Sequence, residues 1–359
     1  MESVKYVGLD VHQATISIAV ISAQGRLVMS SVVPTQAAAM VEFVSGLRGR
    51  LHVTLEEGSH SAWLHDLLVR RVARLVVCNP RQNALLKAGN KSDRIDARKL
   101  AELLRADLLS PVYHGESSTR ALQQLVRSYS SLTEDTTRVM ARLKAVYRSQ
   151  AIGCAGKKLY AARRRAEWLA KLEEAGLRRR AERLFEELDL LQKLRRQARQ
   201  EVMEESKKHA AVKLLRTVPF LGPFLGPLRA AVLVARVQTP RRFRSKRQLW
   251  SYCGLALETR SSADYGYQDG ELVRRRRPVF VRGLNWNHNH DLKNVFKSAA
   301  TTASAMPGPW RDFYQQRVNS GMAPAMARLT LARKIAAVAL VLWKKGVSFD
   351  AEYLKQPAA

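Results

Sequence analysis

Four acidic residues in the N-terminal third are placed where they could hold a metal ion. Asp10 and Glu56 each follow an apolar run typical of a buried strand, and Asp93 and Asp96 lie three residues apart, on one face of an expected helix. Clustered carboxylates can fold together only around divalent cations, which polarise a phosphate and stabilise charge on its attacking and leaving oxygens. An oxygen-only ligand set favours Mg²⁺ or Mn²⁺. We therefore predict metal-assisted chemistry on a phosphodiester.

Each of these acids also has an ordinary structural interpretation. An aspartate after a strand is more often a turn or cap residue, and Asp93 is suited to be the N-cap of its helix. Glu57 is the alternative to Glu56. We predict a site because four such acids coincide at strand and helix ends.

Zinc is not expected. Cys78, Cys154 and Cys253 are far apart and odd in number, so they make neither a zinc set nor a disulfide framework. His60 and His65 are five residues apart, which is not a metal-ligand spacing, and we interpret the histidines near residue 288 as structural.

The elements that must position the acids form an α/β domain at residues 1–112. The order of elements is βββαβαβα. We predict strands at 4–9, 15–21, 27–33, 52–55 and 75–78, and helices at 36–47, 61–72 and 95–104.

Residues 113–212 predict a long helical arm, with a break between two helices at 153–156. Leu184, Leu188 and Leu191 suit a coiled-coil seam. A plain spacer or dimerisation arm is one interpretation, and direct nucleic-acid contact is the other.

Residues 213–359 predict a mainly helical, basic domain. Its start resembles a helix-hairpin-helix, in which a glycine turn offers backbone N–H groups to a phosphate, with an ordinary Gly/Pro turn as the alternative. A loop-like stretch is expected at 258–278 and a terminal helix at 325–344.

The chain is strongly basic, and the charge is unevenly distributed. Its 359 residues contain 61 Lys plus Arg and 31 Asp plus Glu, for a net charge of +30. Residues 1–112 contribute +4, residues 113–212 +9 and residues 213–359 +17. A folded chain with this charge indicates a polyanionic partner. No apolar run approaches a membrane span and no secretory signal is visible, so we expect a cytoplasmic protein without a membrane partner.

Ordered motifs at both ends carry a resemblance to a known family. They are GLDVH at 8–12, E-x-G-x-H-S-x-W at 56–63, N-P-R at 79–81, K-x-D-x-x-D-A-x-x-L-A at 91–101, and the stretches at 218–237, 242–257 and 282–300. Together they resemble the DEDD transposases of the insertion sequence one-ten family. The resemblance covers about seven-tenths of the chain. The middle resembles the family only in its general helical character.

The resemblance implies a fold and a mechanism. The N-terminal domain would be RNase H-like, similar to Holliday-junction resolvases, with Mg²⁺ held by Asp10, Glu56, Asp93 and Asp96. Glu56 matches the family's glutamate because one residue separates it from Gly58, as in the family's motif. The C-terminal domain would carry a serine that forms a covalent phosphoserine with DNA.

The nucleophile falls at Ser262, where the sequence departs twice from the family. Leu257 replaces the usual proline and Ala263 the usual glycine, so Ser261 is a second candidate. A longer segment than usual, DYGYQDGELVRRRRP, follows.

The resemblance also implies partners: donor and target DNA, a structured non-coding guide RNA, and further copies of the chain in a homodimer or tetramer. In such a scheme base pairing reads sequence and the protein reads backbone and shape. Tyr265, Tyr267, Trp250 and Tyr252 offer stacking faces. The candidate nucleic-acid contacts are Arg241, Arg242, Arg244, Lys246, Arg247, Arg274, Arg275, Arg276, Arg277 and Trp286.

Two other functions fit the same residues. A resolvase-like nuclease would use the acids to activate water and would form no covalent intermediate. A non-catalytic nucleic-acid scaffold would need neither the acids nor the serine.

Overall fold

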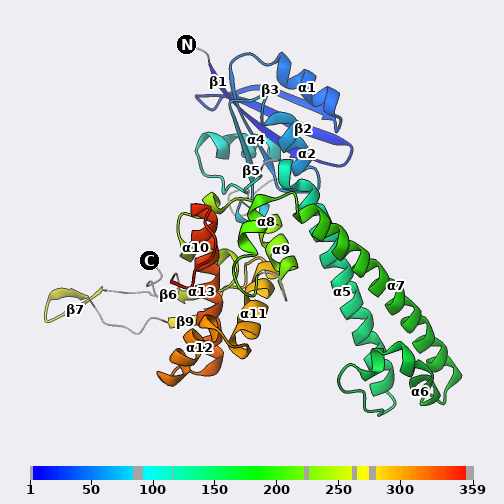
Figure 1. The fold of residues 1–359 in the computed structure, drawn as a ribbon. Helices are drawn as coiled ribbons and strands as arrows, with labels where there is room; N and C mark the ends of the chain where they lie inside the picture. Colours follow the sequence, from blue (N-terminus) through cyan, green and yellow to red (C-terminus); the bar gives the residue numbers. More distant parts are fainter. Residues whose placement is uncertain are drawn as a thin grey trace. The chain divides into compact units, whose positions relative to one another are not determined.

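The protein forms two compact units, Met1–Ser117 and Ser118–Ala359. The computed structural model describes residues 3–83, 92–115, 117–221, 226–260, 265–274 and 280–352 (Figure 1). The finer division of the chain at residues 112 and 212 stays a prediction.

A five-stranded mixed sheet is the centre of the first unit. Its strand order is β3-β2-β1-β4-β5. β1 pairs antiparallel with β2 and parallel with β4. On the outer sides, β2 pairs antiparallel with β3, and β4 pairs parallel with β5. The predicted strands are confirmed, as β1 (Val4–Val11), β2 (Thr15–Ser22), β3 (Leu27–Pro34), β4 (Arg50–Glu56) and β5 (Arg74–Cys78).

Helices cover both faces of this sheet. α1 (Ala37–Gly46) and α2 (Ser61–Leu68) share a core with alternate residues of β1, including Val7 and Leu9. α4 (Asp93–Arg105) packs on the other face, against β1, β2 and β4. The predicted α/β domain is thus confirmed, although α2 ends four residues before the predicted end of its helix. A short helix, α3 (Pro80–Asn83), follows β5.

Gly8 lets α4 lie directly on β1. A Cβ atom at this position would be 2.0 Å from the carbonyl oxygen of Ala97 and 2.6 Å from the backbone nitrogen of Ala101. Ala19 of β2 pairs with Gly8 in the ladder and is buried, so small residues line the contact. Only glycine permits so close an approach of two backbones.

The second unit begins with a long arm of two helices, α5 (Arg120–Arg148) and α7 (Ala175–Ser206), which lie side by side (Figure 1). The C-terminal half of α5 shares a core with the N-terminal half of α7, so the helices are antiparallel. The break between them is much wider than predicted, because short helices fill it: η2 (Lys158–Tyr160), η3 (Ala162–Arg164) and α6 (Arg165–Ala170). Supercoiling of the pair stays a prediction.

The remainder of the second unit is a helical core, which includes the predicted terminal helix. Phe296 and Trp310 are fully buried there. Its helices are α8 (Ala210–Leu215), α9 (Pro227–Val237), α10 (Lys246–Tyr252), α11 (His290–Ala305), α12 (Pro309–Asn319) and α13 (Pro324–Lys345), with the turn η4 (Pro240–Arg242). Among the helices of the described ranges, none is long and apolar enough to cross a bilayer.

The prediction of a loop at 258–278 is wrong, because the segment contains strands. β6 (Leu257–Arg260) pairs with β9 (Phe280–Leu284), and β7 (Tyr265–Gln268) forms a hairpin with β8 (Glu271–Arg274). The hairpin turns at Asp269 and Gly270, which both have positive φ, as a two-residue turn of this type requires. Both strands are exposed, so the sequence lacks the apolar alternation that usually reveals a strand.

The approach at Gly8 makes a testable prediction about stability. Gly8→Ala should destabilise the first unit by about 2 kcal/mol or more, because the added methyl overlaps the backbone of α4. Hydrogen–deuterium exchange should become faster in peptides from β1 and α4. Gly46→Ala is the control, since a Cβ there meets no atom within 4 Å. Unchanged exchange in β1 and α4 of the Gly8 variant would contradict this packing argument.

Candidate metal site and nucleic-acid interface

Strand register places Asp10 beside Glu56. The last pair between β1 and β4 is Leu9 with Leu55, and both leucines face the core under α1 and α2. The next residue on each strand is an acid, and alternation turns both acids toward the face covered by α4. Two carboxylates therefore stand at adjacent strand ends, on the same face of the sheet.

The N-terminus of α4 brings the other two acids to that face. Ser92 is the N-cap, and its hydroxyl accepts a hydrogen bond from the backbone N–H of Ile95 at 3.3 Å. Asp93 and Asp96 occupy the first turn. The alternative interpretation of Asp93 as the N-cap is thus wrong, and its side chain is directed elsewhere.

His12 joins Asp10 and Asp93. Its Nε2 atom lies 3.1 Å from Oδ2 of Asp10 and 3.5 Å from Oδ1 of Asp93. Each of the three residues offers a ligand atom within 4.8 Å of the other two. The Asp10 side chain is 16% exposed, whereas His12 and Asp93 are 49% and 61% exposed. The cluster is therefore open to a large ligand on one side.

His12 was not among the residues predicted from the sequence. The residue was visible as the last letter of GLDVH, two positions after Asp10, so strand alternation puts both side chains on one face. Its backbone N–H donates to the carbonyl of Thr15 at 2.9 Å, and the Thr35 hydroxyl donates to its carbonyl. These contacts fix the turn after β1 and thereby hold the imidazole near the acids.

Glu57, the alternative to Glu56, has a different environment. Its Oε2 atom is 2.6 Å from Nε2 of His114. The His114 ring stacks on His65 of α2, with 4.9 Å between ring centroids. Because α2 packs on the face opposite α4, these contacts turn Glu57 away from Asp10 and favour Glu56 as the acid of the cluster.

The donor set suits a divalent cation. Asp10 and Asp93 supply carboxylate oxygens in reach of one another, and the register adds Glu56 next to Asp10. Hard cations such as Mg²⁺ take carboxylate and water oxygens, and an imidazole nitrogen extends the set toward Mn²⁺. Such an ion would act as a Lewis acid on a phosphate oxygen.

The cysteines and the histidine pair near residue 288 have structural surroundings. Burial raises the pKa of the Cys253 thiol, and all three cysteines are buried, so none is a reactive nucleophile. The His288 ring lies against Gly254, where a Cβ would be 2.4 Å from the ring, and burial lowers the pKa of His288. The expected structural role of these residues fits this packing.

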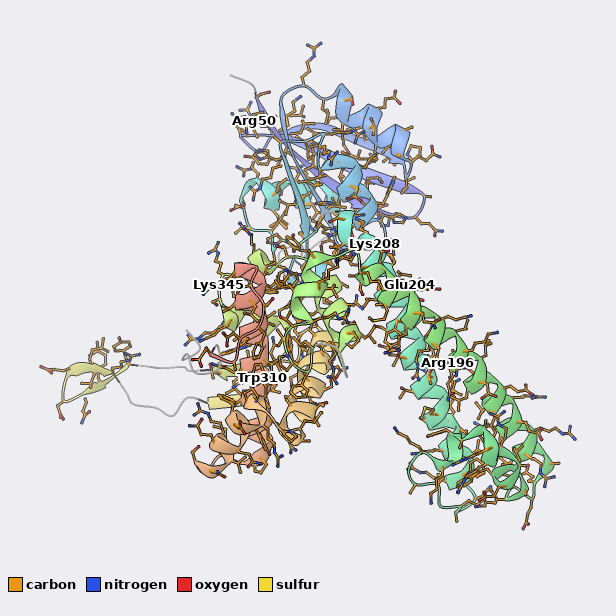
Figure 2. All side chains as sticks on the ribbon, viewed as in Figure 1. Arg50, Arg196, Glu204, Lys208, Trp310 and Lys345 are labelled. Atoms are coloured by element: carbon orange, nitrogen blue, oxygen red, sulfur yellow. The ribbon has the colours of Figure 1, made fainter. Side chains whose placement is uncertain are left out.

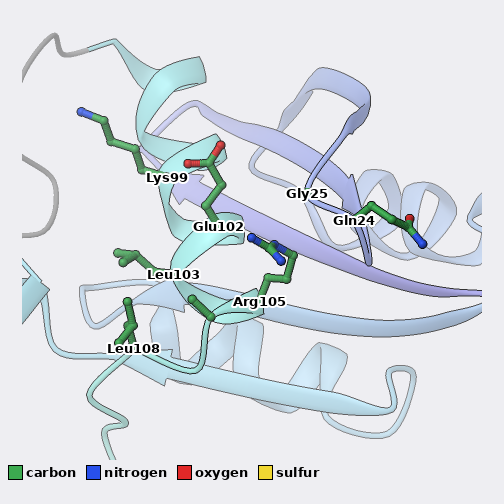
Figure 3. Close-up of a pocket in the computed structure, with 8 residues that line it drawn as sticks. Gln24, Gly25, Lys99, Glu102, Leu103, Arg105 and Leu108 are labelled. Carbon is green, nitrogen blue, oxygen red and sulfur yellow. The ribbon is translucent and has the colours of Figure 1, made fainter.

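One pocket of the first unit lies away from the acids. It opens between the turn after β2, at Gln24 and Gly25, and the C-terminal half of α4 (Figure 3). Glu102 and Arg105 line it with opposite charges. Glu102 is nine residues beyond Asp93, about 14 Å along the helix axis, so the pocket is separate from the candidate metal site.

In the described part of the predicted nucleic-acid interface, some cations are exposed and others contact aromatic rings. Arg241, Arg244, Arg247 and Arg274 are exposed. The Arg242 guanidinium lies over the Tyr252 ring at 4.4 Å, and the Lys246 ammonium is 5.7 Å from the Trp250 ring. Ser261, Ser262, Arg275, Arg276 and Arg277 lie outside the described residues.

The aromatic candidates divide in the same way. Trp250 and Tyr252 pack against the helical core, and the indole of Trp250 donates to the carbonyl of Arg333 at 3.0 Å. Trp286 is 85% exposed, and Tyr267 is 75% exposed. In the β7–β8 hairpin Tyr265 is opposite Arg274, which puts a ring and a cation on one exposed face. The exposed aromatics therefore offer stacking faces, whereas Trp250 and Tyr252 belong to the core.

Comparison with known proteins identifies the class as transposases. Residues 7–149 match the DEDD transposase family of IS110, and residues 213–315 match the transposase family IS116/IS110/IS902. Between them the two matches cover more than half of the chain, and the chain belongs to the IS110 family of transposases.

A curated relative agrees with this assignment. The chain is 31% identical over 134 residues to the insertion element IS116 uncharacterized 44.8 kDa protein of Streptomyces clavuligerus. The match covers 37% of this chain and 29% of the relative, so the chain spans less than a third of that protein's length.

The cluster makes a prediction about cation binding. Asp10→Asn should abolish Mn²⁺ binding, because it removes the less exposed of the two carboxylates in the cluster. His12→Ala should weaken Mn²⁺ binding more than Mg²⁺ binding, because nitrogen ligands contribute more to Mn²⁺. Calorimetric titration of the full chain with each ion measures both effects.

Glu42→Gln is the matched control, since Glu42 is exposed on α1 and the change also removes one negative charge. Equal losses in the Glu42 and Asp10 variants would contradict a localised site.

Proposed function

We propose that this protein is a DNA transposase that cuts and rejoins DNA strands through a covalent phosphoserine. The observation that carries the proposal is the approach of Asp93 to Asp10 and His12, beside Glu56, in a chain of net charge +30. A cation bound at these strand ends would offset the repulsion between the gathered carboxylates, which supports a metal site. Membership of a transposase family supports the same conclusion.

An RNase H-like first unit is part of the proposal. The sheet order β3-β2-β1-β4-β5, with an antiparallel meander followed by two parallel strands, supports it. In this arrangement the acids of β1 and β4 stand at the strand ends, where α4 closes the site.

Four acids would hold Mg²⁺ in this scheme: Asp10, Glu56, Asp93 and Asp96. The bound cation would withdraw charge from the scissile phosphate and stabilise the charge that develops on it. The chain's own contribution is to fix the carboxylates through β1, β4 and the first turn of α4, so that little is reorganised when the phosphate arrives.

Ser262 would be the nucleophile. Its Oγ forms a bond to phosphorus while the bond from phosphorus to the departing sugar oxygen breaks; the hydroxyl loses a proton and the departing oxygen gains one. The phosphoserine keeps the energy of the phosphodiester for rejoining. Ser261 is the neighbouring alternative.

We propose donor and target DNA and a structured guide RNA as partners, and a homodimer or tetramer as the working state. The excess of +17 in residues 213–359 and the exposed Arg241, Arg244 and Arg247 support a large polyanion on the second unit. The side chain of Trp286 would stack on an unpaired base.

Trapping the covalent adduct tests the mechanism. Incubation with labelled donor DNA and Mg²⁺ should give a denaturant-resistant protein–DNA species, which Ser262→Ala should abolish while DNA affinity is kept. Ser261→Ala is the matched control and should retain the adduct. An adduct that survives in Ser262→Ala but is lost in Ser261→Ala would move the nucleophile by one residue.

The same assay separates the competing functions. Strand cleavage without any adduct in the wild type would instead indicate a resolvase-like nuclease that activates water. Asp10→Asn that retained full strand transfer would contradict the role of the acids and leave a scaffold function.

The guide RNA has its own test. Protein purified after expression together with the flanking element should carry one discrete RNA, because a polyanion paired with so many cations dissociates slowly. Sequencing of the bound RNA measures this. A random sample of cellular RNA would contradict the guide and favour recognition by the protein alone.

A further inference from the structure

The positive charge of the arm is concentrated at one end. Residues 142–183, which we call the arm tip, contain 13 basic and 4 acidic residues, whereas the remainder of residues 113–212 contains 9 of each. The whole net charge of +9 in this third of the chain therefore belongs to the tip. The tip lies at the end of α5 and the start of α7.

Most of these cations are exposed and available. Arg165 is engaged, since it forms two 2.8 Å hydrogen bonds to Asp189 and lies over the Phe185 ring. Lys171 pairs with Glu167. Arg178 donates to the backbone carbonyl of Leu172. The other exposed cations for which the described residues show no carboxylate partner are Arg142, Arg148, Lys157, Lys158, Arg163, Arg179, Arg180 and Arg183.

The tip is a folded platform rather than a flexible tail. Tyr147, Phe185 and Leu159 are fully buried in its core, and Trp168 is nearly so. Exposed cations are thus held on a fixed surface, which lowers the entropic cost of binding a rigid polyanion. Of the large aromatic rings of the tip, Tyr147 and Trp168 are buried, and Tyr160 is partly buried with its hydroxyl donating to the carbonyl of Met140 at 3.1 Å. The tip therefore offers cations rather than stacking faces, which favours the backbone of a duplex over unpaired bases.

Spacing along α7 gives the tip a definite reach. Val202 belongs to the helical core of the second unit, and Arg179 lies 23 residues before it, about 35 Å along the helix axis. That distance is about one turn of duplex DNA. Residues 184–206 between the two ends carry 6 acids and 4 cations, with Arg196 and Glu204 on this stretch (Figure 2). The middle of α7 therefore has no net attraction for phosphate.

We propose that the arm tip is a second contact site for duplex DNA, about one helical turn of DNA away from the point where α7 joins the helical core of the same unit. This inference rests on the proposed function for the identity of its partner. Two basic surfaces separated by a nearly neutral shaft would grip the backbone at two points and set the path of the DNA that flanks the exchange site.

Two charge-matched variants test the proposal. The tip variant is Arg179→Gln, Arg180→Gln and Arg183→Gln, and the shaft control is Lys193→Gln, Arg196→Gln and Arg199→Gln. Each removes three positive charges from exposed positions of α7. Thermal melting should be nearly the same for both, because exposed substitutions of this kind change stability little.

Fluorescence anisotropy of the full chain with a duplex of about 40 base pairs measures the effect. At about 0.1 M salt the tip variant should bind at least about tenfold more weakly, and its slope of log affinity against log salt should be smaller by about 2 to 3. The shaft control should change affinity by less than about threefold. Equal losses in the two variants, or no loss in the tip variant, would overturn the proposal.

Duplex RNA of the same sequence identifies the partner. A tip variant that lost affinity for RNA but kept its affinity for DNA would also overturn the assignment to DNA. The proposed function fails by a different result, which is the absence of an adduct and of strand transfer in the wild type. Weakened DNA binding by the tip variant would still stand in that case.

Discussion

The direct contact of α4 with β1 at Gly8 is the constraint on which the candidate site depends. Asp10 and Glu56 are fixed by strand pairing, but Asp93 comes from a helix that must lie low on the sheet to approach Asp10. A single methyl group at Gly8 would lift α4 by overlap with its backbone. Because Asp10 and Glu56 are held by strand pairing and cannot follow the helix, even a small lift would move the first turn of α4 away from Asp10.

This packing explains how acids can gather in a chain of such positive charge. Strand pairing holds the backbone next to the acids rigidly. Leu9 of β1 pairs with Leu55 of β4, and both are fully buried one residue before the acids. Like-charged side chains repel, so their proximity is favourable only with a cation or an imidazole between them. His12 already lies between Asp10 and Asp93, and thus marks the point where positive charge is needed.

Much of the first unit could be predicted from sequence because its inner strands are apolar runs, as expected for a sheet that is covered on both faces. The strands that hold Asp10 and Glu56 each contain three consecutive buried residues just before the acid. Ser92 was not predicted as the N-cap, because the adjacent Asp93 is also a residue type suited to that position. His12 was missed because its role depends on contact with α4, which no local pattern reports. Strands β7 and β8 were missed for another reason: they are short and exposed, and they lack an apolar face.

The net charge of the arm region becomes informative only when its charged residues are located on the fold. The total of +9 for residues 113–212 does not say where on the arm the charge lies. The antiparallel pairing of α5 and α7 gathers that charge at one end and leaves a shaft with more acids than cations. Repulsion among the cations at the tip is the cost of this arrangement, and a hydrophobic core with buried Tyr147 and Trp168 offsets it. A basic surface that the hydrophobic core holds together despite this repulsion is suited to a partner that neutralises its positive charge.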